Sequence, residues 1–292
     1  TGNDVAAALR NGAGRVDAVD IDPAILEIGR RLHPERPYDD PRVVTVVDDA
    51  RSFLKRTDRQ YDLIVFGTLD SHTVNSAMSN LRIDNYVYTV EAFREVRRRL
   101  KPGGVVWLLF AFERRATGDR LYAMLTEAFG HPPVAFYNQD VRALSPSGGG
   151  GTFVTDRDGA IEARINATPT FREIVAQHRI LPQGSALLAS DDWPYLYVPG
   201  RAVPHLYLVV MGVIVGAVAL LVRRHVGTLR SLDWHFFLLG AAFLLLEVQS
   251  VSRMALLFGN TWEVSATVIG AILFMVLAAN AMAALVPQRA LP

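Results

Sequence analysis

Residues 16–23 read Val-Asp-Ala-Val-Asp-Ile-Asp-Pro, a short apolar strand that ends in acidic residues and runs into a helix begun by proline. This unit is typical of an α/β nucleotide-binding fold, in which a carboxylate at the carboxyl end of a strand can bind both hydroxyls of a ribose. Helix-forming residues from Val5 to Leu9 precede it. We therefore expect a strand and most of a glycine-rich turn upstream, so that the printed chain begins inside its own cofactor loop.

Strand and helix patterns alternate after this unit. The patterns predict strands at 16–20, 43–47, 63–66, 105–110, 134–137 and 151–154, and helices at 5–10, 23–32, 51–55, 90–100, 119–129 and 168–178. Residues 101–104, Lys-Pro-Gly-Gly, read as a tight turn. Strands separated by single helices pair in parallel through right-handed crossovers. We therefore predict an α/β fold with a doubly wound, mostly parallel sheet that lacks its first strand and closes with an antiparallel hairpin.

Composition divides the chain near residue 200. Residues 1–180 mix charged and apolar segments as a soluble nucleotide-binding domain does, and residues 181–202 read as a linker. Apolar stretches follow at 203–222, 234–258 and 264–286. Each has about twenty residues or more, enough to cross a hydrocarbon core of roughly 30 Å. We therefore predict a membrane domain over 203–292 with three transmembrane helices, in a multi-pass protein of the cytoplasmic membrane.

Cysteine and histidine content limits the kinds of site. The chain has no cysteine, which excludes disulfides and thiolate metal sites. Its seven histidines show no paired ligand spacing, so we expect no metal. The net charge of +1 averages two environments and says nothing about partners. No nucleic-acid partner is expected.

A series of short motifs carries a resemblance to a known superfamily. Gly2-Asn3, the strand Val16–Asp20, Val47-Asp48-Asp49-Ala50, Tyr61–Val65 and Leu100-Lys-Pro-Gly-Gly104 follow one another as in class I S-adenosylmethionine-dependent transferases, which have a Rossmann-like sheet. The chain more narrowly resembles the spermidine synthase-like branch, in Asp49-Ala50 before Phe53-Leu54, in an aspartate at 70, and in Tyr88–Phe93. The segment Gly240–Val248 is similar to polytopic bacterial members, in which a synthase-like domain is fused to transmembrane helices.

The resemblance implies S-adenosylmethionine or its decarboxylated form as co-substrate, bound by Gly2, Asp20, Asp49 and Ala50. Asp20 would bind the ribose hydroxyls, because a carboxylate accepts two hydrogen bonds there with good geometry; the alternative is a cap on the next helix. Asp49 would receive the adenine amino group, with Ala50 leaving room for the base, or would cap the helix at 51–55. Asp22 is predicted to be a helix cap, and Asp48 is a weaker candidate than Asp49.

Asp70 is the predicted catalytic residue. It follows the carboxyl end of a strand, where this topology places active sites. The resemblance to aminopropyltransferases implies that Asp70 orients and deprotonates the attacking amine as a general base. The family pattern continues Asp-Ser-Ser-Asp-Pro, but residues 70–74 read Asp-Ser-His-Thr-Val and lack the second acid, which would hold the other cationic end of a polyamine. His72 is either an alternative base or an ordinary loop histidine, and residues 71–85 form a candidate lid.

Two polar groups near the apolar segments have no assigned role. Residues 191–195, Asp-Asp-Trp-Pro-Tyr, recur in the membrane-fused branch, and their aromatic residues could form an interfacial belt. Glu247 and Arg253 lie within the second apolar stretch, where ionisable groups usually face a partner or a cavity. An interhelical clamp, in which they pair with each other or with Asn280, and a transport path both remain open.

The arginines after the first apolar stretch, Arg223, Arg224 and Arg230, would place that loop in the cytoplasm and the nucleotide-binding domain outside. Donors of the S-adenosylmethionine type are cytosolic, so we place the domain in the cytosol.

Three classes of function follow. The resemblance favours a membrane-anchored transferase of polyamine biosynthesis, which moves an aminopropyl group to an amine and has a small-molecule acceptor and the lipid bilayer as partners. The alternative within this enzyme class is an S-adenosylmethionine-dependent methyltransferase of a small molecule. The second class is a non-catalytic membrane transport or channel protein whose nucleotide domain senses a metabolite, and the third is a degenerate, non-catalytic scaffold. Homo-oligomer formation stays open.

Overall fold

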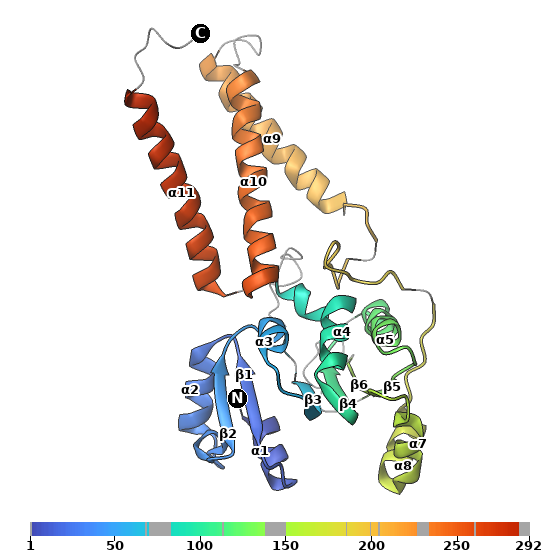
Figure 1. The fold of residues 1–292 in the computed structure, drawn as a ribbon. Coiled ribbons are helices and arrows are strands. Elements are labelled where there is room, and N and C mark those ends of the chain that lie inside the picture. The colour runs from blue at the N-terminus through green and yellow to red at the C-terminus, as the bar shows by residue number, and fades with distance from the viewer. Residues whose placement is uncertain are drawn as a thin grey trace. The chain divides into compact units, whose positions relative to one another are not determined.

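A computed structural model describes residues 2–67, 69, 83–112, 114–137, 150–184, 186–198, 200–203, 205–226, 234–259 and 261–285. The chain forms two compact units (Figure 1). Unit 1 comprises residues 1–198 and 255–262, and unit 2 comprises residues 199–254 and 263–292.

The first part of unit 1 is a parallel pair of strands joined by a helix. Strand β1 (Val16–Asp20) pairs with β2 (Val43–Val47) along its whole length, and α2 (Pro23–Leu32) makes the crossover. Asp22 caps α2 by accepting a hydrogen bond from the amide of Ala24, and Pro23 suits the first helical position because its missing N–H needs no partner there. The helix α1 (Asn3–Arg10) precedes β1, and the 3-10 helix η1 (Pro37–Asp39) precedes β2.

The second part of unit 1 is a four-stranded mixed sheet in the order β3-β4-β6-β5. Strands β3 (Tyr61–Gly67) and β4 (Leu100–Phe110) are parallel, whereas β6 (Gly151–Asp156) runs antiparallel to both β4 and β5 (Val134–Tyr137). The helices are α3 (Ala50–Arg56), α4 (Val90–Arg98), α5 (Arg115–Phe129), α7 (Ile161–Ala167) and α8 (Pro169–His178), with the 3-10 helix η3 (Ile83–Tyr88) before α4. Antiparallel pairing of β5 and β6 confirms the predicted closing hairpin.

The main core lies between this sheet and the helices α4 and α5. Phe93 of α4 and Leu121 of α5 are fully buried, as are Leu108 of β4 and Phe153 of β6. Each such side chain removed from water stabilises the fold by about 1.5–3 kcal/mol. The core therefore holds β3 and β4 firmly and fixes the carboxyl end of β3.

The predicted α/β class is confirmed, but the sheet is in two pieces. Among the described residues, no strand pairs with the inner edge of β1 or of β3, and a cavity of about 1020 Å³ lies between them. Val19 of β1 and Leu63 and Val65 of β3 line it, and Leu63 is 50 % exposed although it lies within a strand.

Two local features differ from the predicted elements. Strand β4 begins at Leu100, earlier than the predicted residue 105. The predicted turn at 101–104 lies within it, between the pairs Leu100–Tyr61 and Val105–Leu63, where the register shifts. A Cβ on Gly104 would lie 2.8 Å from the carbonyl oxygen of Tyr61, so the missing side chain lets β4 approach β3 there. The helix α7 was not predicted, since Ile161 and Ile165 are the only apolar residues of one helical face in a short, polar segment.

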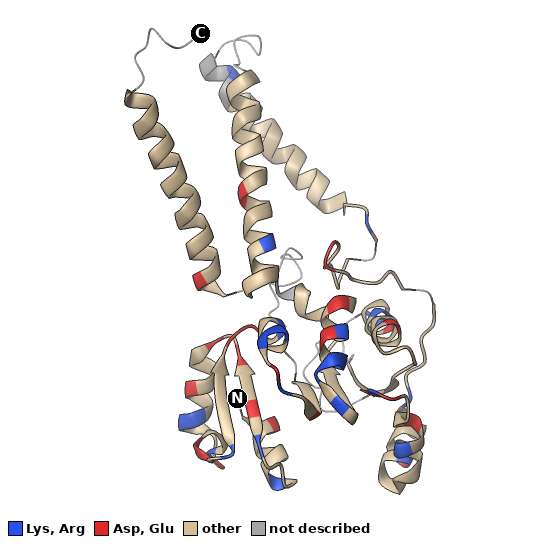
Figure 2. Cartoon of the chain, viewed as in Figure 1, with Lys and Arg blue, Asp and Glu red and all other residues tan. Residues whose placement is uncertain are grey.

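Unit 2 consists of the helices α9 (His205–Val226), α10 (Trp234–Phe258) and α11 (Trp262–Leu285), apart from the residues at 255–262. Their bounds lie close to the three predicted apolar segments. Within the described residues, α10 and α11 are long and apolar enough to cross a membrane, with mean hydropathies of 1.5 and 2.3, whereas the apolar part of α9, His205–Leu221, is shorter. Figure 2 shows few charged residues along α10 and α11.

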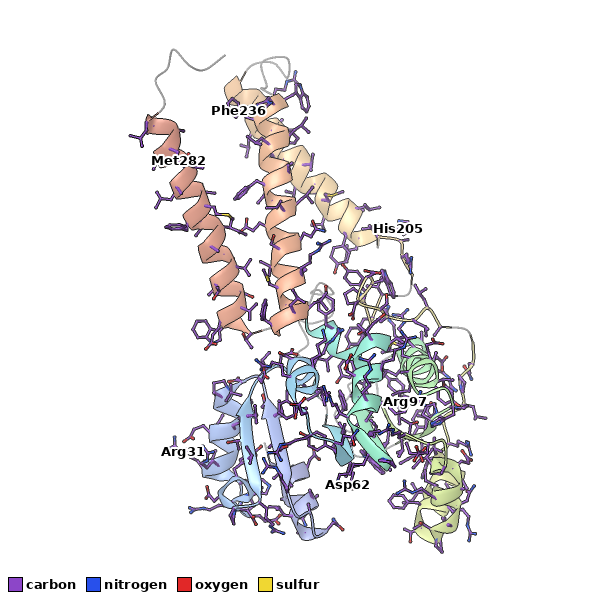
Figure 3. The ribbon with its side chains drawn as sticks, in the orientation of Figure 1. Arg31, Asp62, Arg97, His205, Phe236 and Met282 are labelled. Carbon is purple, nitrogen blue, oxygen red and sulfur yellow. The ribbon has the colours of Figure 1, made fainter. Side chains whose placement is uncertain are left out.

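The apolar side chains of these helices remain exposed within unit 2. Phe236 of α10 and Met282 of α11, labelled in Figure 3, are 68 % and 62 % exposed. Among the described residues, Glu247 and Arg253 form no ion pair with each other and no hydrogen bond with Asn280, so the clamp, one of the two alternatives, is not observed there.

Candidate donor-binding site

Gly2 is the first residue of the site, and its position leaves no room for a side chain. It has φ 103°, in the left-handed region, and it caps the amino end of α1. A Cβ on Gly2 would lie 3.0 Å from Cγ of Pro37 and 3.2 Å from Cδ2 of His33. The next residue, Asn3, has its Oδ1 3.0 Å from Nε2 of His33. Glycine is therefore needed both for the backbone conformation and for the close packing of η1.

Asp20 is the last residue of β1 and presents its carboxylate at the carboxyl end of that strand. Its Oδ1 accepts a hydrogen bond from the amide of Asp22 at 2.9 Å, while Asp22 itself caps α2. The helix cap is therefore provided by Asp22, as predicted, and not by Asp20. Among the described residues, Oδ2 of Asp20 has no hydrogen-bond partner. A carboxylate with one oxygen held by the backbone and the other open is suited to accept hydrogen bonds from a ligand hydroxyl.

Gly2 and Asp20 line the large cavity, together with Gly67 at the carboxyl end of β3. Tyr38 and Asp4 line the same cavity. Burial raises the pKa of the Tyr38 phenol, and the negative charges of Asp20 and Asp4 raise it further. Asp62, labelled in Figure 3, lies near the amino end of β3, where its Oδ2 is 2.7 Å from Nζ of Lys101.

The motif analysis did not identify Asp4 or Tyr38. A Cβ on Gly67, the last residue of β3, would collide with the carboxylate of Asp4, so the glycine lets that carboxylate approach the strand end. Neither residue belongs to a periodic pattern that would distinguish it from an ordinary surface residue. Their placement depends on tertiary packing of α1 and η1 against the strand ends.

Asp49 and Ala50 lie at the beginning of α3. Oδ1 of Asp49 accepts a hydrogen bond from the amide of Ser52 at 2.9 Å, so the helix-capping alternative is observed. The neighbouring Asp48 forms an ion pair with Arg56, and its amide donates to the carbonyl of Asp20 at 3.0 Å. This last bond places the start of α3 beside the end of β1.

Ala50 lines a second, smaller cavity of about 130 Å³, together with the apolar side chains of Phe53 and Phe66. Val19, Leu63, Val65 and Leu69 line both cavities. Asp49 lines neither of them. The structure therefore brings Gly2 and Asp20 together in one cavity and places Ala50 in an adjacent apolar one.

The predicted catalytic residue, Asp70, lies outside the described residues, as do residues 71–82 with His72 and most of the candidate lid. The preceding residue, Leu69, lines both cavities. The structure describes no group of three or more His, Asp or Glu residues that could hold a metal ion within the ranges given above.

Asp191 has a clear structural partner that the sequence did not reveal. It forms a two-pronged ion pair with Arg51, the residue after Ala50, with N–O distances of 2.7 and 2.6 Å. Trp193 is buried, and the guanidinium of Arg120 lies 5.1 Å from the centre of its ring. The interfacial-belt interpretation is therefore wrong for Trp193, because its ring packs inside unit 1.

Comparisons with known proteins agree with the motifs. Residues 9–110 match the family described as "Spermine/spermidine synthase domain". The polyamine aminopropyltransferase of Korarchaeum cryptofilum is 26 % identical over 132 residues, which cover 44 % of this chain and 38 % of that protein. The spermine synthase of Arabidopsis thaliana is 30 % identical over 94 residues, covering 31 % of this chain and 24 % of that protein. The matched region thus spans well under half the length of these relatives.

Among solved structures, the spermidine synthase of Thermotoga maritima is similar with a TM-score of 0.44 and 14 % identity, over 73 % of this chain and 65 % of that one. Human methyltransferase-like protein 13 in complex with SAH gives a TM-score of 0.42 and 15 % identity, over 63 % and 80 %. The resemblance to the spermidine synthase-like branch is confirmed by the family match, which ends at the last residue of β4.

Proposed function

We propose that unit 1 binds decarboxylated S-adenosylmethionine and transfers its aminopropyl group to a small amine. The observation that carries this proposal is the meeting of Gly2, Asp20 and Tyr38 in one cavity at the carboxyl ends of β1 and β3, with an open carboxylate oxygen on Asp20. Ligands of this fold class bind outside the carboxyl ends of the strands. The family match of residues 9–110 supports the same reaction class.

Charge in this cavity favours the decarboxylated donor. Asp4, Asp20 and Tyr38 line the same cavity. Two carboxylates attract the decarboxylated donor, which carries a sulfonium and an ammonium group, more strongly than S-adenosylmethionine, whose carboxylate cancels one of these positive charges. Asp20 would bind the ribose hydroxyls, and Ala50 with its apolar neighbours would accommodate the adenine ring.

The transfer is a displacement at carbon. The amine nitrogen attacks the methylene next to the sulfonium, so that a carbon–nitrogen bond forms and a carbon–sulfur bond breaks with its electron pair left on sulfur. The products are the aminopropylated amine and methylthioadenosine. The attacking amine must lose a proton, a task for a carboxylate base. We assign this task to Asp70, which follows Leu69 at the end of β3.

Methyl transfer from S-adenosylmethionine is the second candidate, and the observation that favours it is the missing second acid of the polyamine site. Thr73 stands where the family pattern has a second acid for the distal ammonium of a polyamine. Putrescine should therefore be a poor acceptor compared with a smaller or less cationic amine. Incubation with each donor, followed by the product mass, separates an aminopropyl gain from a methyl gain.

We further propose that α10 and α11, with α9, anchor the protein in the cytoplasmic membrane, with the donor site in the cytosol. Their length, low charge and exposed apolar side chains support an anchor. The cytosolic placement follows from the cytosolic location of the donor. Cysteines introduced at Ser145 and Thr228 would test it, since the chain has no native thiol. Labelling of Ser145→Cys from outside intact cells would contradict it.

A further inference from the structure

The ion pair between Arg51 and Asp191 joins segments that are 140 residues apart in the sequence. The side chain of Arg51 is only 6 % exposed, and both of its terminal nitrogens donate to the Asp191 carboxylate. One of them also donates to the carbonyl of Tyr86, within η3, at 3.0 Å. Arginine and carboxylate groups paired in this way fix geometry as well as charge.

Asp191 is itself held on the amino end of α4. Its Oδ1 accepts a hydrogen bond from Oγ1 of Thr89 at 2.9 Å, and its amide donates to Oε2 of Glu91 at 3.0 Å. Thr89 also caps α4, because its hydroxyl oxygen accepts from the amide of Ala92 at 3.2 Å. Asp191 therefore connects the cap of α4 to the buried guanidinium of α3.

The turn at 190–193 is fixed on both sides of Asp191. Ser190 and Trp193 exchange backbone hydrogen bonds of 3.2 and 2.9 Å, and Ala189 accepts one from the amide of Val90 at 3.0 Å. Further along, Arg120 donates to the carbonyl of Tyr195 at 2.9 Å. A turn anchored at both ends can hold Asp191, and hence Arg51, in one position.

Arg51 is the second residue of α3, so its side-chain contacts act on the amino end of that helix. Asp49 and Ala50 immediately precede it, and the amide of Asp48 is bonded to the carbonyl of Asp20. From this arrangement we propose that Asp191 is a positioning residue: through Arg51 it holds the amino end of α3 against β1, so that the adenosine end of the donor finds its site preformed. This inference rests on the proposed binding of an adenosine-containing donor.

A positioning role predicts a specific kinetic change. Asp191→Asn removes the negative charge but keeps the size of the side chain, and so loosens the hold on Arg51. We expect KM for the donor to rise about tenfold or more, since hydrogen bonds to charged groups contribute more than neutral ones. KM for the acceptor and kcat should stay within about twofold, because the reacting atoms are bound elsewhere. Asp191→Glu should recover part of the donor affinity.

Asp192→Asn is the matched control. Asp192 lies in the same turn, is exposed, and has no hydrogen-bond or ion-pair partner among the described residues. Its substitution removes the same charge without touching Arg51, so the donor KM should stay at the wild-type value. An equal rise in both variants would overturn the proposal in favour of a general effect of charge.

Asp191→Asn leaves Arg51 buried without its partner, which can impair folding. The double variant Arg51→Met/Asp191→Asn removes both groups and so avoids this problem. It should fold and still show the raised donor KM, whereas a donor KM equal to that of wild type would overturn the proposal. Unchanged donor KM in a folded Asp191→Asn variant would overturn it as well.

Amide hydrogen exchange separates this inference from the proposed function. If the wild-type protein transfers no group from either donor, the proposed reaction fails, but exchange at residues 50–56 can still be compared in the same variants. The positioning role predicts faster exchange at the start of α3 in Asp191→Asn than in wild type. In Asp192→Asn the exchange rate there should equal that of wild type. Equal exchange in both variants and wild type would show that Asp191 does not order α3.

Discussion

Substitution of Asp20 by asparagine should weaken donor binding by about 2 kcal/mol, or about thirtyfold in Kd. In the structure Oδ1 of Asp20 accepts from the amide of Asp22 at 2.9 Å, and Oδ2 has no partner among the described residues. Asparagine can keep the first bond with its carbonyl oxygen. It replaces the second oxygen by an amide nitrogen, which cannot accept a hydrogen bond from the ribose, and it removes the charge.

The neighbouring residue provides a control for this change. Asp22→Asn keeps a good helix cap on α2, since asparagine and aspartate cap equally well, and it removes the same charge within two residues. Calorimetry with decarboxylated S-adenosylmethionine should show the thirtyfold loss for Asp20→Asn and less than about a threefold change for Asp22→Asn. Wild-type affinity in a folded Asp20→Asn variant, or an equal loss in both variants, would refute the ribose assignment.

Three further predictions concern the rest of the molecule. Trp193→Ala should lower the free energy of unfolding by about 3 kcal/mol, because it removes a buried ring that packs against Arg120. Chemical denaturation measures this change, and a value near zero would restore the interfacial interpretation. Burial raises the pKa of Asp191, but the hydrogen bond and charge of Arg51 outweigh it and hold the pKa below its ordinary 3.8. The stabilisation by Asp191 is therefore present above that ordinary value and is lost as the pH falls through the lower folded pKa. Asp191→Asn should abolish this part of the acid dependence of stability, and an unchanged acid profile would contradict it. A chain that ends at Val198 should no longer need detergent, and membrane association of that chain in a flotation assay would place the anchor elsewhere.

Local signals predicted much of the fold. The start of α2 follows from Asp22 and Pro23, which cap and begin the helix. The bounds of β1 and β2 follow from runs of β-branched residues and from the acidic residues at or after their ends. The roles of Asp20 and Asp22 could also be distinguished, because the helix cap must immediately precede Pro23. These features depend on neighbouring residues and are readable without knowledge of the fold.

Other features depend on residues that are far apart in the sequence. Asp191 was recognised as part of a motif, but its partner Arg51 could not be inferred, because no local pattern links the two. Asp4 reaches the end of β3 only because Gly67 lacks a side chain there. The division of the sheet is likewise a tertiary feature: among the described residues β1 pairs with β2 and β3 with β4, and a cavity lies between the two pairs, which strand propensity does not describe.

Product mass tests the central claim most directly. The purified protein in detergent is incubated with decarboxylated S-adenosylmethionine or with S-adenosylmethionine and a panel of small amines, and the products are identified by mass spectrometry. The account predicts the gain of one aminopropyl group with release of methylthioadenosine, and turnover lowered by about 10²–10⁴-fold in Asp70→Asn. A methyl gain, or no transfer from either donor by a protein that binds both, would contradict it.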